Sequence, residues 1–234
     1  MKIALIGYGA MGKLIRRLAE EKGHEVVVVI DDSFADSSAE SLAAKLSGAE
    51  VAIDFTVAEA VKRNVSACVL ANIPLVEGTT GWNKDRESIE KIVSDGNGAF
   101  VFGANFSIGV NLFYKIAEFA AELFSKFPEY ETFLEEQHHS RKLDAPSGTA
   151  LKIKDIVAEH IKKDFTITAT RAGNIPGTHR LGFDGPADQI LLEHTARSRE
   201  GFAFGAITAA EWIVGKKGFF EFTEVMVAQY FPVY

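Results

Sequence analysis

The sequence predicts an α/β fold, in which a doubly wound parallel sheet is joined to a smaller α+β domain. Three observations lead to this class. Strand-like and helix-like segments alternate from Lys2 to Phe102, the first strand ends in a glycine-rich turn, and the pattern changes after Asn105. Repeated strand–helix units favour parallel strands that are joined by right-handed crossovers.

Hydrophobic spacing defines the elements of the first part. Lys2–Ile6 is a short apolar run, and Met11–Lys22 places its apolar residues at helical intervals. Glu25–Ile30 is rich in valine and suits a strand that is buried on both faces. Further strands are expected at Val51–Phe55, Leu75–Val76 and Ala99–Phe102, and further helices at Ala58–Ala71 and Lys84–Val93.

The second part begins with a long amphipathic helix, which is expected over Gly109–Phe127. Next we expect a strand at Tyr130–Gln137 and a helix at Gly148–Lys162, which Ser147 or Asp144 would cap. Strands follow at Phe165–Thr170 and Gln189–Ala196, with turns at Gly173–Thr178 between them. The last expected elements are a helix at Gly205–Val214 and a strand or extended segment at Glu221–Val227. The helix at Gly205–Val214 needs an apolar partner. We therefore assign residues 1–106 and 200–234 to the first domain, and residues 107–199 to the second.

Composition and charge limit the classes of function. The chain has 234 residues and a net charge of −7, and its basic residues form no continuous face, so no nucleic-acid partner is expected. No apolar run is long enough to cross a bilayer, so no membrane partner is expected either. The single cysteine, Cys68, excludes an intrachain disulfide and favours a reducing, cytoplasmic location, with the thiol buried in a helix.

The glycine-rich turn has the spacing of a dinucleotide site. It reads Gly7-Tyr8-Gly9-Ala10-Met11-Gly12, and it lies between a strand and a helix. Glycines let the backbone approach a pyrophosphate, which the N–H groups of the helix N-terminus can bind. Asp31 follows the next strand at about the 20-residue spacing at which a carboxylate accepts ribose hydroxyls. A 2′-phosphate would face Asp31 and Asp32 without a nearby Arg or Lys, so NADH is favoured over NADPH.

Two more turns follow expected strands and belong to the same Rossmann-like site by position. They are Gly78-Thr79-Thr80 and Gly103-Ala104-Asn105-Phe106. Ligands of open α/β sheets bind beyond the carboxyl ends of the strands, and small residues there allow close backbone approach. Ordinary loops rich in small residues are the alternative interpretation of these two turns.

Chemistry is concentrated between His138 and Thr149. Two histidines, an arginine and a lysine fall within five residues of an otherwise acidic protein. The following Pro-Ser-Gly-Thr opens a helix, so Gly148 and Thr149 can hold a carboxylate by N–H and hydroxyl donors. Lys142 adds a charge and a proton, and His138 and His139 titrate near neutrality. A solvated basic loop is the alternative, and the spacing indicates no metal site.

These residues resemble the dihydrodipicolinate reductase (4-hydroxy-tetrahydrodipicolinate reductase) family. The resemblance is carried by His138-His139-x-x-Lys142-x-Asp144-Ala145-Pro146-Ser147-Gly148-Thr149-Ala150, Asp54-Phe55-Thr56, Gly78-Thr79-Thr80-Gly81, Ala104-Asn105-Phe106-Ser107-Ile108-Gly109 and Pro176-Gly177-Thr178-His179. Family-like spacing runs essentially from end to end of the chain.

The resemblance implies a reductase of the diaminopimelate–lysine pathway. It transfers a hydride from NAD(P)H to 4-hydroxy-tetrahydrodipicolinate or dihydrodipicolinate, a small dicarboxylate, and gives tetrahydrodipicolinate. His138 matches the position of a proton donor or acceptor, and Lys142 that of a proton donor. The substrate-binding positions are His139, Ser147, Gly148 and Thr149, and the cofactor positions are those of the three turns and Asp31. The family implies a homotetramer that assembles through the sheets of the second domain.

One departure from the family concerns the cofactor. Many members have a longer glycine-rich loop that contains an arginine, whereas the loop here is compact and lacks it. Two other functions remain open. A different two-domain dehydrogenase is one, although Cys68 lies in the wrong segment for the nucleophile of a semialdehyde enzyme. A module that binds NAD without turnover is the other, and it would have no use for Lys142.

Overall fold

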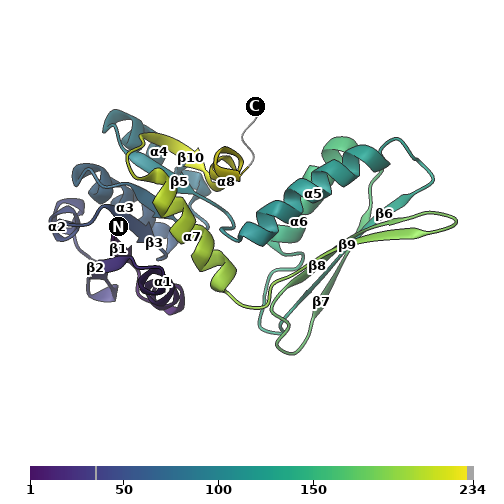
Figure 1. The fold of residues 1–234 in the computed structure, drawn as a ribbon, viewed down its shortest axis with the longest axis horizontal. Coiled ribbons are helices and arrows are strands. Elements are labelled where there is room, and N and C mark those ends of the chain that lie inside the picture. The colour runs from purple at the N-terminus through teal and green to yellow at the C-terminus, as the bar shows by residue number, and fades with distance from the viewer. Residues whose placement is uncertain (35, 231–234) are drawn as a thin grey trace. The chain divides into compact units, whose positions relative to one another are not determined.

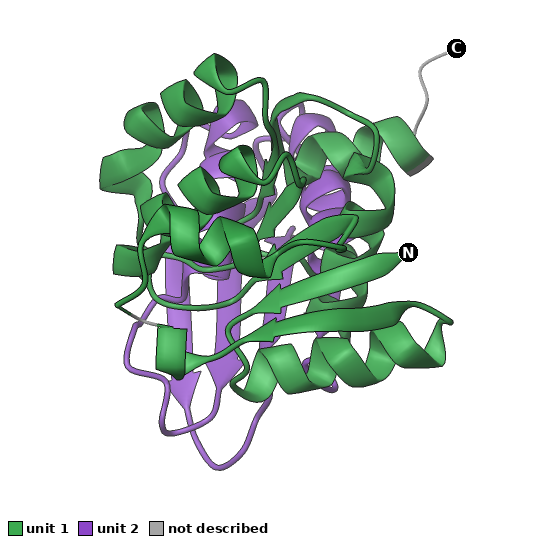
Figure 2. Cartoon of the chain, turned by 90° about the vertical axis from the view of Figure 1, so that its left-hand side faces the viewer, with its two compact units in different colours: residues 1–108, 200–234 green, residues 109–199 purple. Residues whose placement is uncertain are grey.

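The computed structural model describes residues 1–34 and 36–230, which form two compact units (Figures 1 and 2). Unit 1 comprises residues 1–108 together with the chain from Glu200 onward, and unit 2 comprises Gly109–Arg199. The first of these divisions falls two residues after the predicted position, and the second coincides with it. Residue 35 and the end of the predicted first domain, residues 231–234, lie outside the described residues.

Unit 1 is built on a parallel sheet, so the predicted fold class is confirmed. In the described part of the chain the six strands are β1 (Lys2–Ile6), β2 (Glu25–Ile30), β3 (Val51–Asp54), β4 (Leu75–Glu77), β5 (Ala99–Phe102) and β10 (Gly218–Glu221). Their order is β10-β5-β4-β3-β1-β2, and each neighbouring pair is parallel. All the strands therefore end at one edge of the sheet, where the predicted turns lie.

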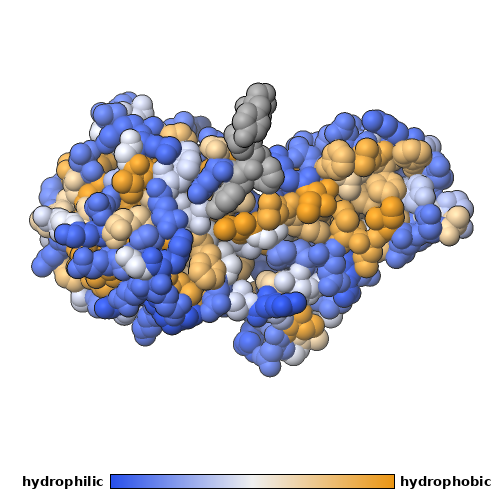
Figure 3. Space-filling model, in the orientation of Figure 1, coloured by the Kyte–Doolittle hydropathy of each residue, from blue (hydrophilic) through white to orange (hydrophobic). Residues whose placement is uncertain are grey.

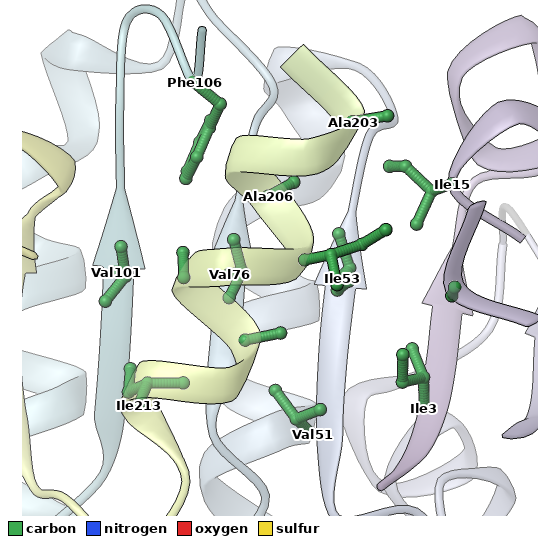
Figure 4. Close-up of a cluster of buried hydrophobic side chains, with 14 of the residues drawn as sticks. Ile3, Ile15, Val51, Ile53, Val76, Val101, Phe106, Ala203, Ala206 and Ile213 are labelled. Atoms are coloured by element: carbon green, nitrogen blue, oxygen red, sulfur yellow. The ribbon is translucent and has the colours of Figure 1, made fainter. Parts of the chain in front are cut away.

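Helices cover both faces of this sheet. The first face carries α1 (Ala10–Glu21), α7 (Glu200–Ile213) and α8 (Phe222–Tyr230), and the second α2 (Ala39–Lys45), α3 (Ala58–Leu70) and α4 (Arg86–Asp95). Short 3₁₀ turns occupy Asp32–Phe34 and Asn83–Asp85. Figure 4 shows the first face, where Ala203, Ala206 and Ile213 of α7 pack over strand residues such as Ile53 and Val76. The small alanines let α7 lie close to the sheet.

One prediction about this sheet was wrong. β2 is an edge strand rather than a strand buried on both faces, and its valines are only partly buried or exposed. Valine favours strands in general because its branched side chain suits a pleated surface, so a valine-rich run does not distinguish an edge strand from a central one. Cys68 is buried in α3, as predicted.

Unit 2 is an α+β domain. It contains α5 (Ile108–Phe124, which begins in unit 1), β6 (Glu131–His138), α6 (Gly148–His160), β7 (Thr166–Arg171), β8 (Thr178–Asp184) and β9 (Gln189–Thr195). The sheet order is β7-β6-β8-β9, with β6 and β7 parallel and the other pairs antiparallel. The helices pack on one sheet face through Phe113, Ala117, Ile153 and Val157, which meet Leu134, Leu181 and Phe183.

The end of the chain differs from the prediction. Glu221–Val227 is not a strand: β10 ends at Glu221, and α8 follows it. The apolar residues Phe222, Val225 and Met226 stand at helical intervals, and all three are buried against unit 1. The β-branched residues of this segment favoured a strand locally, but burial of this one stripe requires a helix.

Sequence reasoning also missed three elements. The helix α2, the strand β8 and the start of β10 at Gly218 were not predicted, and α7 begins at Glu200 rather than Gly205. β8 contains Gly182 and lies next to a turn-rich segment, which hides its alternating pattern. Among the described residues, no helix is long and apolar enough to cross a membrane.

Candidate active site

The glycine-rich turn joins β1 to α1, and each of its glycines has a separate structural reason. Gly7 has a φ of +89°, and a Cβ there would lie 2.2 Å from the carbonyl oxygen of Phe55. A Cβ on Gly12 would lie 2.2 Å from the oxygen of Gly7, so this glycine permits close packing of helix and turn. A Cβ on Gly9, by contrast, would meet nothing within 4 Å. The backbone at Gly9 therefore faces open space, where a pyrophosphate can approach.

A pocket of about 470 Å³ lies at this turn. Its volume is in the range of small-molecule sites. The pocket brings together two of the predicted turns and adds a segment that follows β3; its lining residues are Gly9, Ala10, Met11, Phe55, Thr56, Val57, Ala58, Gly78, Thr79 and Thr80. No side chain caps the N-terminus of α1 at Gly9. The first N–H groups of the helix therefore point toward this space, and the residues present suit a dinucleotide phosphate.

The other predicted cofactor residues do not line the pocket. Tyr8 accepts a hydrogen bond from Arg16 Nη1 (3.3 Å) through its hydroxyl. Asp31 is exposed after β2, and its Oδ1 accepts hydrogen bonds from the backbone N–H and the hydroxyl of Ser33. These bonds lower the pKa of Asp31, so its carboxylate is charged.

The last predicted turn, Gly103-Ala104-Asn105-Phe106, follows β5. Its Asn105 Oδ1 accepts a hydrogen bond from the N–H of Ser107 (2.8 Å). The Phe106 ring is buried and packs on Phe222 at 4.7 Å between ring centroids. A Cβ on Gly205 would lie 1.7 Å from the oxygen of Phe106, which shows how closely α7 holds this turn. This part of the predicted site is therefore fixed to the core of unit 1.

Two buried carboxyl groups support the turns that line the pocket. Asp54 ends β3 and Glu77 ends β4, and the two are partners across the strands. Glu77 Oε1 accepts a hydrogen bond from the N–H of Thr79 (2.7 Å), and Thr79 Oγ1 accepts one from the N–H of Thr56 (2.9 Å). Desolvation raises the pKa of both carboxyls, and Asp54 Oδ1 and Glu77 Oε2 are buried without a hydrogen-bond partner among the described residues. The pair therefore retains a proton and holds two turns together.

In unit 2 the predicted catalytic residue His138 is the last residue of β6. Adjacent residues of a strand point to opposite faces, but β6 ends at His138, so this rule does not fix the direction of His139. His138 is buried, and its ring stands edge-on to that of His179 at 5.2 Å. Glu136 lies two residues earlier, so its side chain shares a strand face with His138. Glu136 Oε2 is 3.3 Å from His138 Nδ1 and 3.7 Å from His179 Nε2.

The N-terminus of α6 lies against the same carboxylate. Ser147 N donates to Glu136 Oε1 (3.0 Å), and Ser147 Oγ caps the helix by accepting from Ala150 N (3.2 Å). Ser147 is buried, whereas a Cβ on Gly148 would meet nothing within 4 Å. Thr149 is hydrogen-bonded to the side chain of Tyr114, a residue of α5. Burial raises the pKa of Tyr114 to about 12. Gly148 and Thr149 therefore lie at the open N-terminus of α6, and the hydrogen bond to Tyr114 fixes the position of Thr149.

Charged groups surround this end of the sheet. Lys142 Nζ lies 2.8 Å from Asp144 Oδ1, and the backbone N–H of Lys142 donates to the oxygen of His139. Arg171 ends β7 opposite His138, and its Nη2 donates to Glu136 Oε1 at 2.7 Å. The same nitrogen donates to the backbone oxygen of Asp144. Arg171 therefore connects the Lys142 turn to the buried carboxylate.

The electrostatics suit proton transfer. Desolvation lowers the pKa of His138, and the positive charges of Lys142 and Arg171 add to this effect, while Glu136 opposes it. Desolvation lowers the pKa of His179 to about 4. Both rings are therefore neutral at neutral pH. Desolvation raises the pKa of Glu136, but the combined hydrogen bonds from Ser147 and Arg171 lower it below the ordinary value.

Sequence reasoning assigned no role to Glu136, Arg171 or His179 in this cluster. Glu136 could have been found, because a residue two positions before a histidine on a strand shares its face. Arg171 and His179 come from other strands, and only the sheet pairing brings them here. Glu136, His138 and His179 place three atoms of the kind that can bind a metal within 4.8 Å of one another. The sequence predicted no metal at this site.

Comparisons with known proteins agree with this geometry. The family model "Dihydrodipicolinate reductase, N-terminus" matches residues 1–106, and "Dihydrodipicolinate reductase, C-terminus" matches residues 109–226. The 4-hydroxy-tetrahydrodipicolinate reductase of Christiangramia forsetii is 36% identical, over 97% of this chain and 98% of its own length. That of Staphylococcus epidermidis is 38% identical, over 96% of this chain and 100% of its own.

A solved structure shows the same fold. It is a dihydrodipicolinate reductase from Paenisporosarcina sp. TG-14 with dipicolinate bound, which superposes with a TM-score of 0.79 at 23% identity. The match covers 96% of this chain and 98% of that one. The two family models together span both units, and the relatives match over nearly their whole length. The chain therefore belongs to the dihydrodipicolinate reductase family.

Proposed function

We propose that this protein is an NAD(P)H-dependent 4-hydroxy-tetrahydrodipicolinate reductase, an oxidoreductase of diaminopimelate and lysine biosynthesis. Relatives that match this chain over nearly their full length carry this name. The observation that carries the proposal is the cluster at the end of β6. There Glu136 contacts a buried neutral His138 and the N-terminus of α6, and Arg171 connects this carboxylate to the Lys142–Asp144 pair.

The substrate is a small dicarboxylate, and unit 2 has donors for it. The backbone at Gly148 faces open space, and the N–H groups of the first turn of α6 can bind a carboxylate. Thr149 adds its hydroxyl from a position that Tyr114 fixes. His139 follows the end of β6 and is only partly buried, so it can contact the second carboxylate. The substrate contact of Ser147 stays a prediction, because its N–H and hydroxyl are engaged within the protein.

Reduction needs a hydride and a proton. The nicotinamide supplies the hydride when it is bound. Lys142 donates the proton, and Asp144 holds its ammonium group at 2.8 Å. His138 relays or accepts a proton as a neutral imidazole, since desolvation keeps its pKa low. With dihydrodipicolinate the two additions saturate one double bond of the ring and give tetrahydrodipicolinate. With 4-hydroxy-tetrahydrodipicolinate the hydroxyl group must also leave as water.

The family establishes a nicotinamide cofactor, and we propose that NADH is preferred over NADPH. The carboxylate of Asp31 is charged and exposed at the end of β2, where an adenosine ribose binds in this fold. It accepts hydrogen bonds from the ribose hydroxyls but repels a 2′-phosphate. The predicted contacts of Tyr8, Gly103, Ala104, Asn105 and Phe106 belong to the same proposal.

We also propose that the protein is a cytoplasmic homotetramer, in which unit 2 provides substrate binding and assembly. An apolar stripe runs along α5 to Phe127; its residues, each between 37% and 63% exposed, are Leu112, Ile116, Phe119, Leu123 and Phe127. Figure 3 shows hydrophobic side chains gathered along this helix. Ile190 and Leu191 of β9 are also exposed. Apolar surface of this extent favours contacts between subunits, and sedimentation equilibrium measures the assembly.

The test is an assay of NADH and NADPH oxidation by absorbance. The substrate is generated in situ from pyruvate and aspartate semialdehyde by the preceding synthase. We expect rapid turnover that depends on the synthase, and a higher kcat/KM with NADH. The control omits aspartate semialdehyde. Absence of turnover, with NADH binding still measurable, would contradict the proposal and favour another dehydrogenase or a non-catalytic NAD module.

A further inference from the structure

We infer that Glu136 is a positioning residue, which holds the neutral ring of His138 with its proton on Nδ1 and leaves Nε2 for proton transfer. The inference rests on the proposed function, since it assumes that His138 acts on the substrate. It concerns a residue that is not among the site residues predicted from the sequence. Glu136 acts through His138 and does not touch the reacting atoms.

The first observation is a pair of unsatisfied atoms that face each other. Glu136 Oε2 and His138 Nδ1 are both buried, and neither has a hydrogen-bond partner within the described chain. They lie 3.3 Å apart. A buried polar atom without a partner has lost its hydrogen bonds to water without replacement, which destabilises the folded state. A proton on Nδ1 places a donor opposite the negatively charged Oε2, whereas a proton on Nε2 leaves two acceptors facing each other.

The second observation is that the carboxylate cannot turn away. Its other oxygen, Oε1, accepts hydrogen bonds from Ser147 N (3.0 Å) and Arg171 Nη2 (2.7 Å). These donors come from α6 and β7, so two elements fix the plane and the charge of the carboxylate. Oε2 is thereby aimed at the rings of His138 and His179. The carboxylate is a fixed acceptor, not a mobile surface group.

The third observation concerns the opposite ring nitrogen. A Cβ on Gly177 would lie 3.2 Å from His138 Nε2, and Gly177 has a φ of +140°. Only glycine suits this backbone conformation, and its lack of a side chain leaves space beside Nε2. The ring of His179 packs edge-on against His138. The ring is therefore anchored on its Nδ1 side and unobstructed by residue 177 on its Nε2 side.

A divalent cation among Glu136, His138 and His179 is the competing explanation, because three ligand-type atoms converge there. Arg171 argues against it. Its guanidinium already donates to the same carboxylate, and the charge of Lys142 also acts on His138. A cation would enter a cluster that two positive groups already neutralise. A proton on Nδ1 places a donor opposite Oε2 without added charge.

The test is a long-range ¹H–¹⁵N NMR spectrum of the full-length protein, which distinguishes the two neutral tautomers of histidine. The His138 signals are assigned by their loss in His138→Asn. We expect a protonated Nδ1 in the wild-type protein above the pKa of the ring. In Glu136→Gln we expect a shift toward protonated Nε2 and a lower pKa of the ring, because a negative charge beside it is lost. The groups that act on this ring are Glu136, Lys142, Asp144, Arg171 and His179.

Kinetics supply the second measurement. Glu136→Gln should lower kcat by about 10²-fold with little change in KM, since binding groups remain while the proton-transfer group is misdirected. The matched control is Glu135→Gln. Glu135 lies on the other face of β6, is 43% exposed, and stands 3.8 Å from Arg180. It should leave the His138 tautomer and kcat unchanged.

Three results would overturn the inference. One is a protonated Nε2 in the wild-type protein, which decides the matter even if Glu136→Gln does not fold. Another is an unchanged tautomer and kcat in a folded Glu136→Gln. The third is a change of the His138 signals when a chelator is added, which would mean a bound metal. Failure of the proposed function would give a different result, namely no turnover by the wild-type protein. The His138 tautomer is measured without substrate, so it still tests the inference in that case.

Discussion

The two units bury carboxyl groups in opposite ways. In unit 1, Asp54 and Glu77 stand side by side at the ends of two strands, and both are fully buried. In unit 2, Glu136 is equally buried but receives hydrogen bonds from Arg171 and the N-terminus of α6. Desolvation raises the pKa of Asp54 and of Glu77, whereas the donors around Glu136 hold its pKa below the ordinary value.

The difference separates two uses of a buried carboxyl. The unit 1 pair retains a proton, so it is a hydrogen-bonded support that holds Thr79 and Thr56 beside the proposed dinucleotide pocket. The unit 2 carboxylate is charged, so it can orient cations and imidazole rings beside the substrate donors. Substitutions in the unit 1 site should therefore alter cofactor affinity, and those in the unit 2 site should alter turnover.

The largest effect is expected for Lys142→Ala. Loss of a general acid typically costs about 10²–10⁴-fold in rate. We expect a loss of this size in kcat, while the Kd for NADH changes less than about threefold, because the cofactor pocket lies in unit 1. Steady-state kinetics and fluorescence titration of NADH measure the two quantities. Lys152→Ala, an exposed lysine on α6, is the control. Near-normal turnover of Lys142→Ala would remove this residue from the mechanism.

A second contrast compares Glu136→Gln with Glu77→Gln in stability. The first substitution leaves the largely buried guanidinium of Arg171 without its carboxylate, and breaking such a pair costs about 3–5 kcal/mol. The second places an amide where the carboxyl already carries a proton, so we expect no loss of stability. Urea unfolding near neutral pH measures both. Equal losses would mean that the two carboxyl sites do not differ in charge.

The sequence predicted the layers of unit 1 well because its signals are local. Strand-like runs, helical spacing and a glycine turn at Gly7–Gly12 each fall within one segment. Where the prediction failed, packing decided the outcome. The segment after Glu221 contains β-branched residues, yet Phe222, Val225 and Met226 bury one helical stripe. The valines of β2 occupy a sheet edge, and nothing in their own pattern reveals which strands will be their neighbours.

The same distinction applies to the site. His138, Lys142, Gly148 and Thr149 could be predicted as site residues because they lie in one short stretch that concentrates chemistry. Arg171 and His179 are more than thirty residues from Glu136 along the chain and reach it only through the register of β7 and β8. Spacing along a sequence cannot predict such register. Glu136 was within reach of sequence reasoning, since it precedes His138 by two residues on one strand.

A smaller effect is expected at the cofactor end of unit 1. Asp31→Asn should weaken NADH roughly tenfold, because a carboxylate binds hydroxyl groups more strongly than an amide does. NADPH should lose little or gain, since a charge that repels its 2′-phosphate is removed. Titration of each cofactor measures the ratio, and Asp32→Asn serves as the matched control for loss of one charge. Equal weakening of both cofactors would mean that other groups hold the ribose.

The smallest effect distinguishes the two carboxyl sites by the pH dependence of stability. The folded-state pKa of Glu77 lies above its ordinary value of 4.5, so the folded state binds more protons and its stability falls as pH rises above that value. Glu136 has a lowered pKa, so the stability it contributes is present above 4.5 and is lost as pH falls below it.

Glu77→Gln should therefore gain stability relative to the wild-type protein between about pH 5 and pH 8, by at most about 1.4 kcal/mol per pH unit. The deficit of Glu136→Gln should shrink only in acid, as the wild-type carboxylate becomes protonated. Urea midpoints across this range give both curves. If the stability difference between Glu77→Gln and the wild-type protein were independent of pH, the unit 1 pair would not retain a proton. Asp54 and Glu77 would then be charged like Glu136, and the two sites would use their buried carboxyls in the same way.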